Sequence, residues 1–317
     1  VEDVVVKLWK GKDGKPYFTG IRREIQNLDE IPFPALEFVD IKKYKNPISK
    51  KSPLCTIMTS RGCPYDCIYC YHNMNYRARS PENVVDEIEW QVNKFGVKEI
   101  LIIDDNFTMN LNRADRICDL IIERNINVTM QCWGGLRVDR INKHILKKLK
   151  QAGIWLVMIA PETGSQETLD RVKKKFTIEQ VKQARQWCRE VGLKTYSFFM
   201  VGFPWENREL IQKTLDFAYE LDTEFTQFSR VYPMMGTELY EQIKDQFQIE
   251  RSDEGFFYGS SNVQLKDITE EEVEKMIRSG YRRMYLNLRR IFQLLFTLKP
   301  TNLYELFKYS IYTRSIG

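Results

Sequence analysis

Histidine is scarce in this chain, with 2 residues among 317, and no uninterrupted apolar run reaches membrane-spanning length. A bilayer-crossing helix needs about 20 mostly apolar residues, so the sequence predicts no membrane span and leaves only peripheral membrane contact open. No internal repeat or low-complexity tract is present. The 48 basic and 43 acidic residues leave a formal charge of +5, and this near-balance gives no strong case for a nucleic-acid partner.

The beginning of the chain lacks a signal-peptide pattern, and its first residue is Val1 rather than methionine, which leaves room for further sequence upstream. The cysteines number 7, and the clustering of three of them fits a reducing compartment better than a disulfide framework. We therefore expect a cytoplasmic protein. The length suits one large α/β core with a small appended region.

The clustered cysteines, Cys63, Cys67 and Cys70, are spaced C-x3-C-x2-C. Gly62 and Pro64, on either side of the first cysteine, bend the backbone. An iron–sulfur cubane normally takes four cysteine ligands, so a cubane held by three keeps one iron open to a substrate or cofactor. The alternative is a structural zinc site in which His72 completes a Cys3His set. Structural zinc usually joins two separated Cys/His pairs, and no second pair occurs here.

From residue 54 onward, strand-like and helix-like segments alternate. Strands are expected over 54–60, 99–103, 127–133, 154–160, 194–201 and 224–231. Helices are expected over 81–95, 111–125, 141–151, 178–191 and 206–221. Ser80 and the Thr177-x-x-Gln180 capping box mark two of the helix starts. Six β/α units with buried parallel strands indicate a doubly wound sheet or an incomplete barrel, and the pattern does not decide between them.

The two ends of the chain are less regular. Residues 4–9 and 17–21 flank Asp13-Gly14, a turn signal that predicts a hairpin. Near the other end, a capping box at Thr269 opens a helix that mixes arginines with apolar residues. That helix either closes the barrel or meets anionic lipid or an apolar substrate. The expected division is a lead-in that wraps the barrel at 1–50, a core at 51–235 and a mainly helical barrel-closing or substrate-side region at 236–317.

The cysteine stretch resembles the signature loop of radical S-adenosylmethionine (radical SAM) enzymes, in which an aromatic residue, here Tyr69, precedes the last cysteine. The resemblance is closest to the branch whose members often carry an N-terminal cobalamin-binding domain. Further family-like segments are Leu28–Pro34, Arg77–Pro81, Ile103–Phe107, Pro161–Asp170 and Phe199–Pro204. The resemblance implies a partial (β/α)6 barrel of the TIM type, with the N-terminal lead-in and a small α-rich C-terminal extension.

The same resemblance implies an activity. The three cysteines hold a [4Fe–4S] cluster in this family, and its open iron chelates the amino and carboxylate groups of SAM. One electron cleaves SAM to a 5′-deoxyadenosyl radical, which abstracts hydrogen from an unactivated C–H bond. Expected outcomes are carbon methylation or an oxidative ring- or bond-forming step, with flavodoxin or ferredoxin as reductant. No Asp-x-His-x-x-Gly motif, whose histidine binds cobalt in this branch, occurs here. Either cobalamin comes from a missing N-terminal domain, or the protein works without it. A Cys3His zinc scaffold without catalysis remains the alternative.

Polar residues follow the predicted strands at the carboxyl edge, where barrels of this kind carry their chemistry. Asp104 and Asp105 follow the second strand. One of them is expected to bind the amino group or ribose of SAM, unless the pair only caps the next helix. Arg137 follows the third strand and suits the SAM carboxylate, and an ion pair with Asp139 or Glu162 is the alternative.

The next two strands end in Glu162 and Gly202. Glu162 is expected to accept hydrogen bonds from the ribose hydroxyls of SAM, although Pro161 and Thr163 replace the glycine and serine common in the family. Gly202 lets the backbone approach a flat ring, here the adenine of SAM, and a plain turn glycine is the alternative. No catalytic residue is singled out, and the aromatic-rich C-terminal region hints at a large or apolar substrate. The other cysteines are expected to fill the core, and His144 to face solvent.

Overall fold

The computed structural model describes residues 24–71, 75–246, 263, 265–286, 288 and 290–292, together with the backbone of 8–10 and 16–18. The two short strands β1 (Leu8–Lys10) and β2 (Pro16–Phe18) pair antiparallel, which confirms the predicted hairpin. Its Asp13-Gly14 turn lies outside the described residues, and so does His72.

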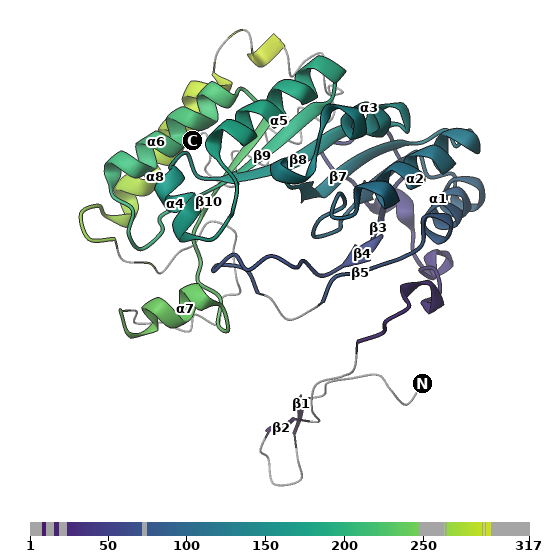
Figure 1. Ribbon diagram of the computed structural model, residues 1–317, viewed down its shortest axis with the longest axis horizontal. Helices are drawn as coiled ribbons and strands as arrows, with labels where there is room; N and C mark the ends of the chain where they lie inside the picture. Colours follow the sequence, from purple (N-terminus) through teal and green to yellow (C-terminus); the bar gives the residue numbers. More distant parts are fainter. Residues whose placement is uncertain are drawn as a thin grey trace.

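Six parallel strands form one sheet in the order β10-β9-β8-β7-β6-β3. Its strands are β3 (Leu54–Ile57), β6 (Glu99–Ile102), β7 (Thr129–Leu136), β8 (Ile154–Glu162), β9 (Lys194–Val201) and β10 (Phe225–Arg230). Because β3 and β10 stand at opposite ends of this order, the sheet is an arc and not a closed barrel (Figure 1). The predicted α/β class and partial six-unit barrel are confirmed.

The helices cover the convex side of the arc, where α1, α2, α3, α5 and α6 lie side by side (Figure 1). The described helices are α1 (Pro81–Phe95), α2 (Leu111–Glu123), α3 (Lys143–Gln151), α4 (Gln166–Arg171), α5 (Ile178–Val191), α6 (Arg208–Leu221), α7 (Glu238–Ile243) and α8 (Glu270–Tyr285). The sequence does not predict α4 and α7, because a helix of 6 residues is shorter than two turns and shows no clear 3.6-residue period.

The predicted capping signals set the helix ends. The Ser80 side chain accepts a hydrogen bond from the N–H of Asn83 at the start of α1, and Gly96 ends that helix at a φ of +66°. Thr177 and Thr269 each form the predicted capping box. These side chains satisfy N–H groups that the first helical turn leaves without an intrahelical partner.

Strand β7 runs past its predicted end, through Gly134 and Gly135 to Leu136. A Cβ added at Gly134 would stand 1.3 Å from the carbonyl oxygen of Asp104, so only glycine permits this close approach of the two backbones. The segment that follows β6 therefore lies directly against β7 at the carboxyl edge of the sheet.

The main core lies between the sheet and its helices. Cys55, Cys118, Cys132 and Cys188 are all buried within it, which confirms that these cysteines fill the core. The side chain of His144 on α3 is exposed, also as predicted. In the part of the chain that the structure describes, no helix combines the length and apolar character needed to cross a bilayer.

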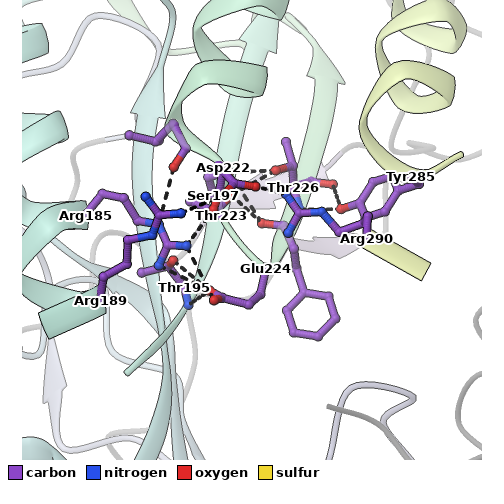
Figure 2. A network of polar contacts seen from close by, with 12 residues as sticks. Arg185, Arg189, Thr195, Ser197, Asp222, Thr223, Glu224, Thr226, Tyr285 and Arg290 are labelled. Carbon is purple, nitrogen blue, oxygen red and sulfur yellow. Dashed lines mark hydrogen bonds and ion pairs between the residues drawn. The ribbon is translucent and has the colours of Figure 1, made fainter. Parts of the chain in front are cut away.

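A polar network lies at the amino ends of β9 and β10 (Figure 2). We call this amino end of the sheet the floor of the arc. The buried carboxylate of Glu224 accepts hydrogen bonds from the N–H and the hydroxyl of Thr195 and pairs with Arg185. Asp222 ends α6 in the left-handed conformation and pairs with Arg290. Each of these carboxylates thus has a cationic partner, which offsets the free-energy cost of removing it from water.

Helix α8 covers the open edge of β10. The hydroxyl of Tyr281 accepts a hydrogen bond from the N–H of Phe228 at 2.8 Å, and the hydroxyl of Tyr285 accepts one from the N–H of Thr226 at 2.7 Å. Each hydroxyl also donates to the carbonyl of the same strand residue, at 3.5 and 3.3 Å. Two tyrosines one helical turn apart therefore take the place of a neighbouring strand and satisfy an edge that would otherwise be free to pair with another chain.

We expect the double variant Tyr281→Phe/Tyr285→Phe to lower the free energy of unfolding by about 2–4 kcal/mol, because each lost hydroxyl leaves strand groups unpaired. Urea unfolding followed by circular dichroism measures the change. Tyr219→Phe, an exposed tyrosine on α6, is the matched control and should change stability by less than about 0.5 kcal/mol. Equal losses in the two proteins would show that the hydroxyls do not protect the edge.

Candidate cofactor site

The cysteine loop begins at the short strand β4 (Ser60–Arg61), which pairs antiparallel with β5 (Arg77–Ala78) and closes the loop at its base. The N–H of Cys70 donates to the carbonyl of Cys67 at 3.0 Å, which makes a turn between these two cysteines. The backbone of Ile68 bonds on one side to the segment after α4 and on the other to the start of α7. The loop is therefore held from three directions.

The three thiols lie close enough to influence one another. Burial raises the pKa of Cys70 to about 12; the Lys174 ammonium opposes this rise, and Cys67 and Cys63 add to it. Burial likewise raises the pKa of Cys63. Thiols in such surroundings bind as thiolates when a metal replaces the proton. Within the described residues, no three His, Cys, Asp or Glu side chains are grouped closely enough to hold a metal ion.

Asp104 lies beneath the base of the loop. It is 1% exposed, and its carboxylate accepts hydrogen bonds from the N–H of Thr59 at 2.6 Å and from the hydroxyls of Thr59 and Ser60. Arg113 offsets its charge and donates to the carbonyl of Thr59 at 2.6 Å. Asp104 thus fixes the point where the cysteine loop leaves the sheet.

Asp105, unlike Asp104, is exposed. Its carboxylate accepts a hydrogen bond from the N–H of Gly62 at 2.9 Å, where the φ of +80° favours glycine. Its charge also contributes to the raised pKa of Cys63, so it lies beside the first cysteine. Neither acid caps α2, because Asn110 holds that position.

Glu162 ends β8 at a φ of +68°, a conformation uncommon outside glycine. The residue is 4% exposed, and its Oε1 accepts hydrogen bonds from the Tyr69 hydroxyl at 2.8 Å and from the Lys174 ammonium at 2.6 Å. Lys174 also donates to the Tyr69 hydroxyl, at 2.9 Å. Glu162 Oε2 is buried without a hydrogen-bond partner in the described structure. Buried carboxylate oxygens normally have partners, so this oxygen marks a place for a donor from a bound molecule.

Arg137 stands at the end of β7 and pairs with Asp139 through Nε at 3.0 Å and Nη2 at 3.3 Å. Its Nη2 also donates to the carbonyl of Lys174 at 2.7 Å. The guanidinium stacks on Tyr65 of the cysteine loop, 3.5 Å from the ring centroid. The ion pair with Asp139 is therefore present, and the contact with a SAM carboxylate stays a prediction for the remaining edge of the guanidinium.

The turn after β9 is shaped by Gly202 and Glu206. A Cβ added at Gly202 would meet no atom within 4 Å, so the φ of +89°, rather than lack of space, favours glycine. Glu206 Oε2 accepts hydrogen bonds from the N–H groups of Gly202 at 2.8 Å and Phe203 at 3.1 Å, while its Oε1 is buried without a described partner. Burial raises the pKa of Glu206 to about 7. The ring of Phe203 packs against Tyr69, with centroids 6.2 Å apart, so this turn adjoins the cysteine loop.

Three consecutive lysines after α4 complete the surroundings, and the sequence analysis missed them. Lys173 pairs with Glu238 of α7 at 2.6 Å, and Lys175 pairs with Asp66 of the cysteine loop at 2.7 Å. Lys174 between them is 8% exposed and turns inward. A lysine run usually marks a solvated surface, so the pattern gives no sign that its middle member is buried. Glu206 was missed for a similar reason, because nothing in its sequence neighbourhood signals burial.

The structure gathers most of the predicted residues around the three cysteines: Tyr69, Asp105, Arg137, Glu162 and Gly202. Asp104 supports the loop from below instead. The three cysteines of the loop match in number and residue type the ligands of an iron–sulfur cluster with one open iron, although their thiols do not converge on a single metal-ion position in the described structure. The buried carboxylate oxygen without a donor and the nearby ammonium fit a polar cofactor beside them.

Replacing Lys174 by methionine should lower the free energy of unfolding by about 3–5 kcal/mol, because Glu162 then remains as an uncompensated buried charge. Adding Glu162→Gln should restore part of this loss. Lys175→Met is the matched control, since its exposed pair with Asp66 should contribute at most about 1 kcal/mol. Urea unfolding of the anaerobically reconstituted protein measures all three, and equal losses at the two lysines would argue against the buried pair.

Glu206 predicts a pH dependence of stability. Its folded pKa of about 7 lies above the ordinary value of 4.5, so the folded state binds the proton more tightly than the unfolded chain between these values. This contribution stabilises the fold below pH 4.5, falls as pH rises through 7, and totals about 3 kcal/mol. As pH rises from 4.5 to 7, wild type should therefore lose about 3 kcal/mol of unfolding free energy relative to Glu206→Gln, whose side chain does not titrate. A difference that stays constant with pH would contradict the burial of this carboxyl group.

Comparison with known proteins agrees with this geometry. The family model described as the radical SAM superfamily matches residues 57–218, a range that includes the three cysteines, Glu162 and Gly202. An uncharacterized methyltransferase of Pyrococcus horikoshii is 32% identical over 268 residues, which are 83% of this chain and 57% of the relative. An anaerobic magnesium-protoporphyrin IX monomethyl ester cyclase of Cereibacter sphaeroides is 28% identical over 314 residues, 90% of this chain and 50% of the relative. The chain thus spans about half the length of these curated relatives.

Among solved structures, the cobalamin-dependent S-adenosylmethionine radical enzyme OxsB superposes with a TM-score of 0.70. The match covers 97% of this chain and 51% of that one at 16% identity, so it shows a shared fold. The family model spans half of the sequence and contains the cysteine loop, which confirms the resemblance drawn from the sequence. The chain belongs to the radical SAM superfamily, and its cofactors are a [4Fe–4S] cluster and SAM.

Proposed function

We propose that this chain is the catalytic domain of a radical SAM methyltransferase, or of an enzyme that closes a ring or forms another bond oxidatively. The observation that carries the proposal is the contact between Tyr69 and Glu162, which joins the cysteine loop to a buried carboxylate with a free oxygen. The names of the two curated relatives, a methyltransferase and a cyclase, support these outcomes. The chemistry that the cluster supplies when bound is reductive cleavage of SAM to a 5′-deoxyadenosyl radical, which abstracts hydrogen from an unactivated C–H bond.

The cysteine loop and Glu162 have separate tasks in this proposal. Cys63, Cys67 and Cys70 are the cluster ligands. Glu162 Oε2 accepts a hydrogen bond from a ribose hydroxyl of SAM, which satisfies the unpaired buried oxygen. Lys174 compensates the buried charge of that carboxylate, because its ammonium lies 2.6 Å from Oε1.

The remaining contacts to SAM are assigned to polar groups near the cysteines that are exposed or only partly used by protein contacts. Asp105 is exposed beside the first cysteine, so we assign the amino group of SAM to it. Asp104 is occupied by Thr59 and Ser60 and positions the loop instead. Arg137 is assigned the carboxylate of SAM through the edge that Asp139 does not use. The backbone at Gly202 is assigned the adenine, next to the ring of Phe203.

Further components lie outside this sequence. Because the chain spans about half of its curated relatives, we assign any cobalamin to a separate domain. A flavodoxin or ferredoxin is the proposed electron donor, the proposed location is cytoplasmic, and no nucleic-acid partner is proposed. The alternative Cys3His zinc scaffold depends on His72, which the structure does not describe, and no observation favours it.

Cys67→Ala should abolish 5′-deoxyadenosine formation by anaerobically reconstituted protein supplied with dithionite and SAM, because one cluster ligand is lost. Iron and sulfide content should fall with it. Cys118→Ala, a buried cysteine on α2, is the matched control and should retain both cluster and product. Formation of 5′-deoxyadenosine by neither wild type nor control would end the proposal. Production of S-adenosylhomocysteine with substrate would distinguish methylation from hydrogen abstraction alone.

A further inference from the structure

The inner, concave face of the sheet carries side chains that the SAM site does not use. Successive strand residues point to opposite faces, and the burial along β9 alternates accordingly. Thr195, Ser197, Phe199 and Val201 are buried on the helix side, whereas Tyr196, Phe198 and Met200 stay partly exposed on the inner side.

The neighbouring strands extend this inner face. The strand register sets Met158 beside Tyr196, Gln227 beside Phe198, and Ser229 beside Met200. The ring of Trp133 packs against Tyr196 with centroids 5.3 Å apart. Ile100 and Ile102 of β6 lie in the helix-side core, and Ile103, directly after the strand, is 39% exposed.

Charge is confined to the two ends of this face in the described strands. At the floor, Glu99 is fully buried and accepts hydrogen bonds from Trp155, Gln131 and the N–H of Lys51. At the carboxyl edge of the sheet, which we call the rim, Glu162 is already paired with Lys174. The residues between these levels are apolar or neutral, in a chain whose composition is 29% charged.

Neutral polar groups centred on Gln227 interrupt the apolar surface. The hydroxyl of Tyr196 donates to Gln227 Oε1 at 2.6 Å, and Gln227 Nε2 donates to the Ser229 hydroxyl at 3.3 Å. A partly exposed amide fixed in this way can orient a ligand without offering a counter-charge.

Resting on the proposed function, we propose that the inner face binds the reacting part of the substrate, and that this part is an uncharged, mainly apolar molecule with one hydrogen-bonding group that Gln227 recognises. A charged group on this face would lose its water without meeting an opposite charge. The face reaches the SAM site through Met200, two residues before Gly202 on the same chain segment. A molecule bound here therefore presents its C–H bonds toward the rim where SAM is assigned.

A pair of dyes with the same aromatic frame tests the proposal on the full chain, reconstituted anaerobically and without SAM or reductant. N-phenyl-1-naphthylamine is neutral, and 8-anilinonaphthalene-1-sulfonate adds one negative charge. Fluorescence titration should give one site for the neutral dye, with at least tenfold weaker binding of the sulfonate. Equal affinity for the two dyes, or no saturable binding of the neutral one, would overturn the proposal.

Matched variants locate the site. Ile103→Asp places a charge on the inner face and should weaken neutral-dye binding at least tenfold, whereas Ile122→Asp on α2, at a residue of similar exposure, should leave it unchanged. Met158→Asp replaces Ile103→Asp if circular dichroism shows the latter unfolded. Equal binding by the inner-face and α2 variants would overturn the assignment.

The dye assay and the SAM cleavage assay test the two proposals separately. If wild type forms 5′-deoxyadenosine from SAM but binds the neutral dye no better than the charged one, the substrate class is wrong and the proposed function stands. If dye binding follows the expected pattern but SAM is not cleaved, the proposed function is wrong, and the inner face is an apolar ligand site of another kind.

Discussion

A buried ion pair between Glu162 and Lys174 organises the carboxyl edge of the sheet, and Glu162 Oε2 has no hydrogen-bond partner in the described structure. Glu162 and Lys174 are both removed from water, and the hydroxyl of Tyr69 bonds to each of them. Segments from β8, from the turn after α4 and from the cysteine loop therefore meet at one point of compensated charge. Because an unpaired charge in this place would be far more costly than an exposed one, the three segments hold one another in register.

Charge and backbone polarity are satisfied at the ends and at the edge of the arc, and the described strand residues between those ends carry apolar or neutral side chains on the concave face. The floor network around Glu224 satisfies the charges at the amino ends of the strands (Figure 2). Tyr281 and Tyr285 satisfy the free edge of β10 from α8. The inner face, where we propose that the substrate binds, adjoins the carboxyl edge at which barrels of this kind carry their chemistry.

Much of the fold could be predicted from sequence because its signals are local. Caps at Ser80 and Thr177 and the alternation of strand and helix depend on neighbouring residues alone. The choice of a partial barrel needed the family resemblance, because a doubly wound sheet has the same alternation. The site was predicted only in part. Asp104 is buried whereas the adjacent Asp105 is exposed, and Lys174 is buried by residues distant in the chain. Neither difference can be seen in a local pattern.

The most direct test of the central claim, that the cysteine loop and Glu162 form one SAM site, is an electron paramagnetic resonance titration. The spectrum of the dithionite-reduced, reconstituted protein is recorded against increasing SAM, in wild type and in Glu162→Ala. The account predicts that SAM changes the cluster signal in wild type and that the variant needs at least tenfold more SAM for the same change. A signal that ignores saturating SAM, or identical titrations in the two proteins, would contradict it.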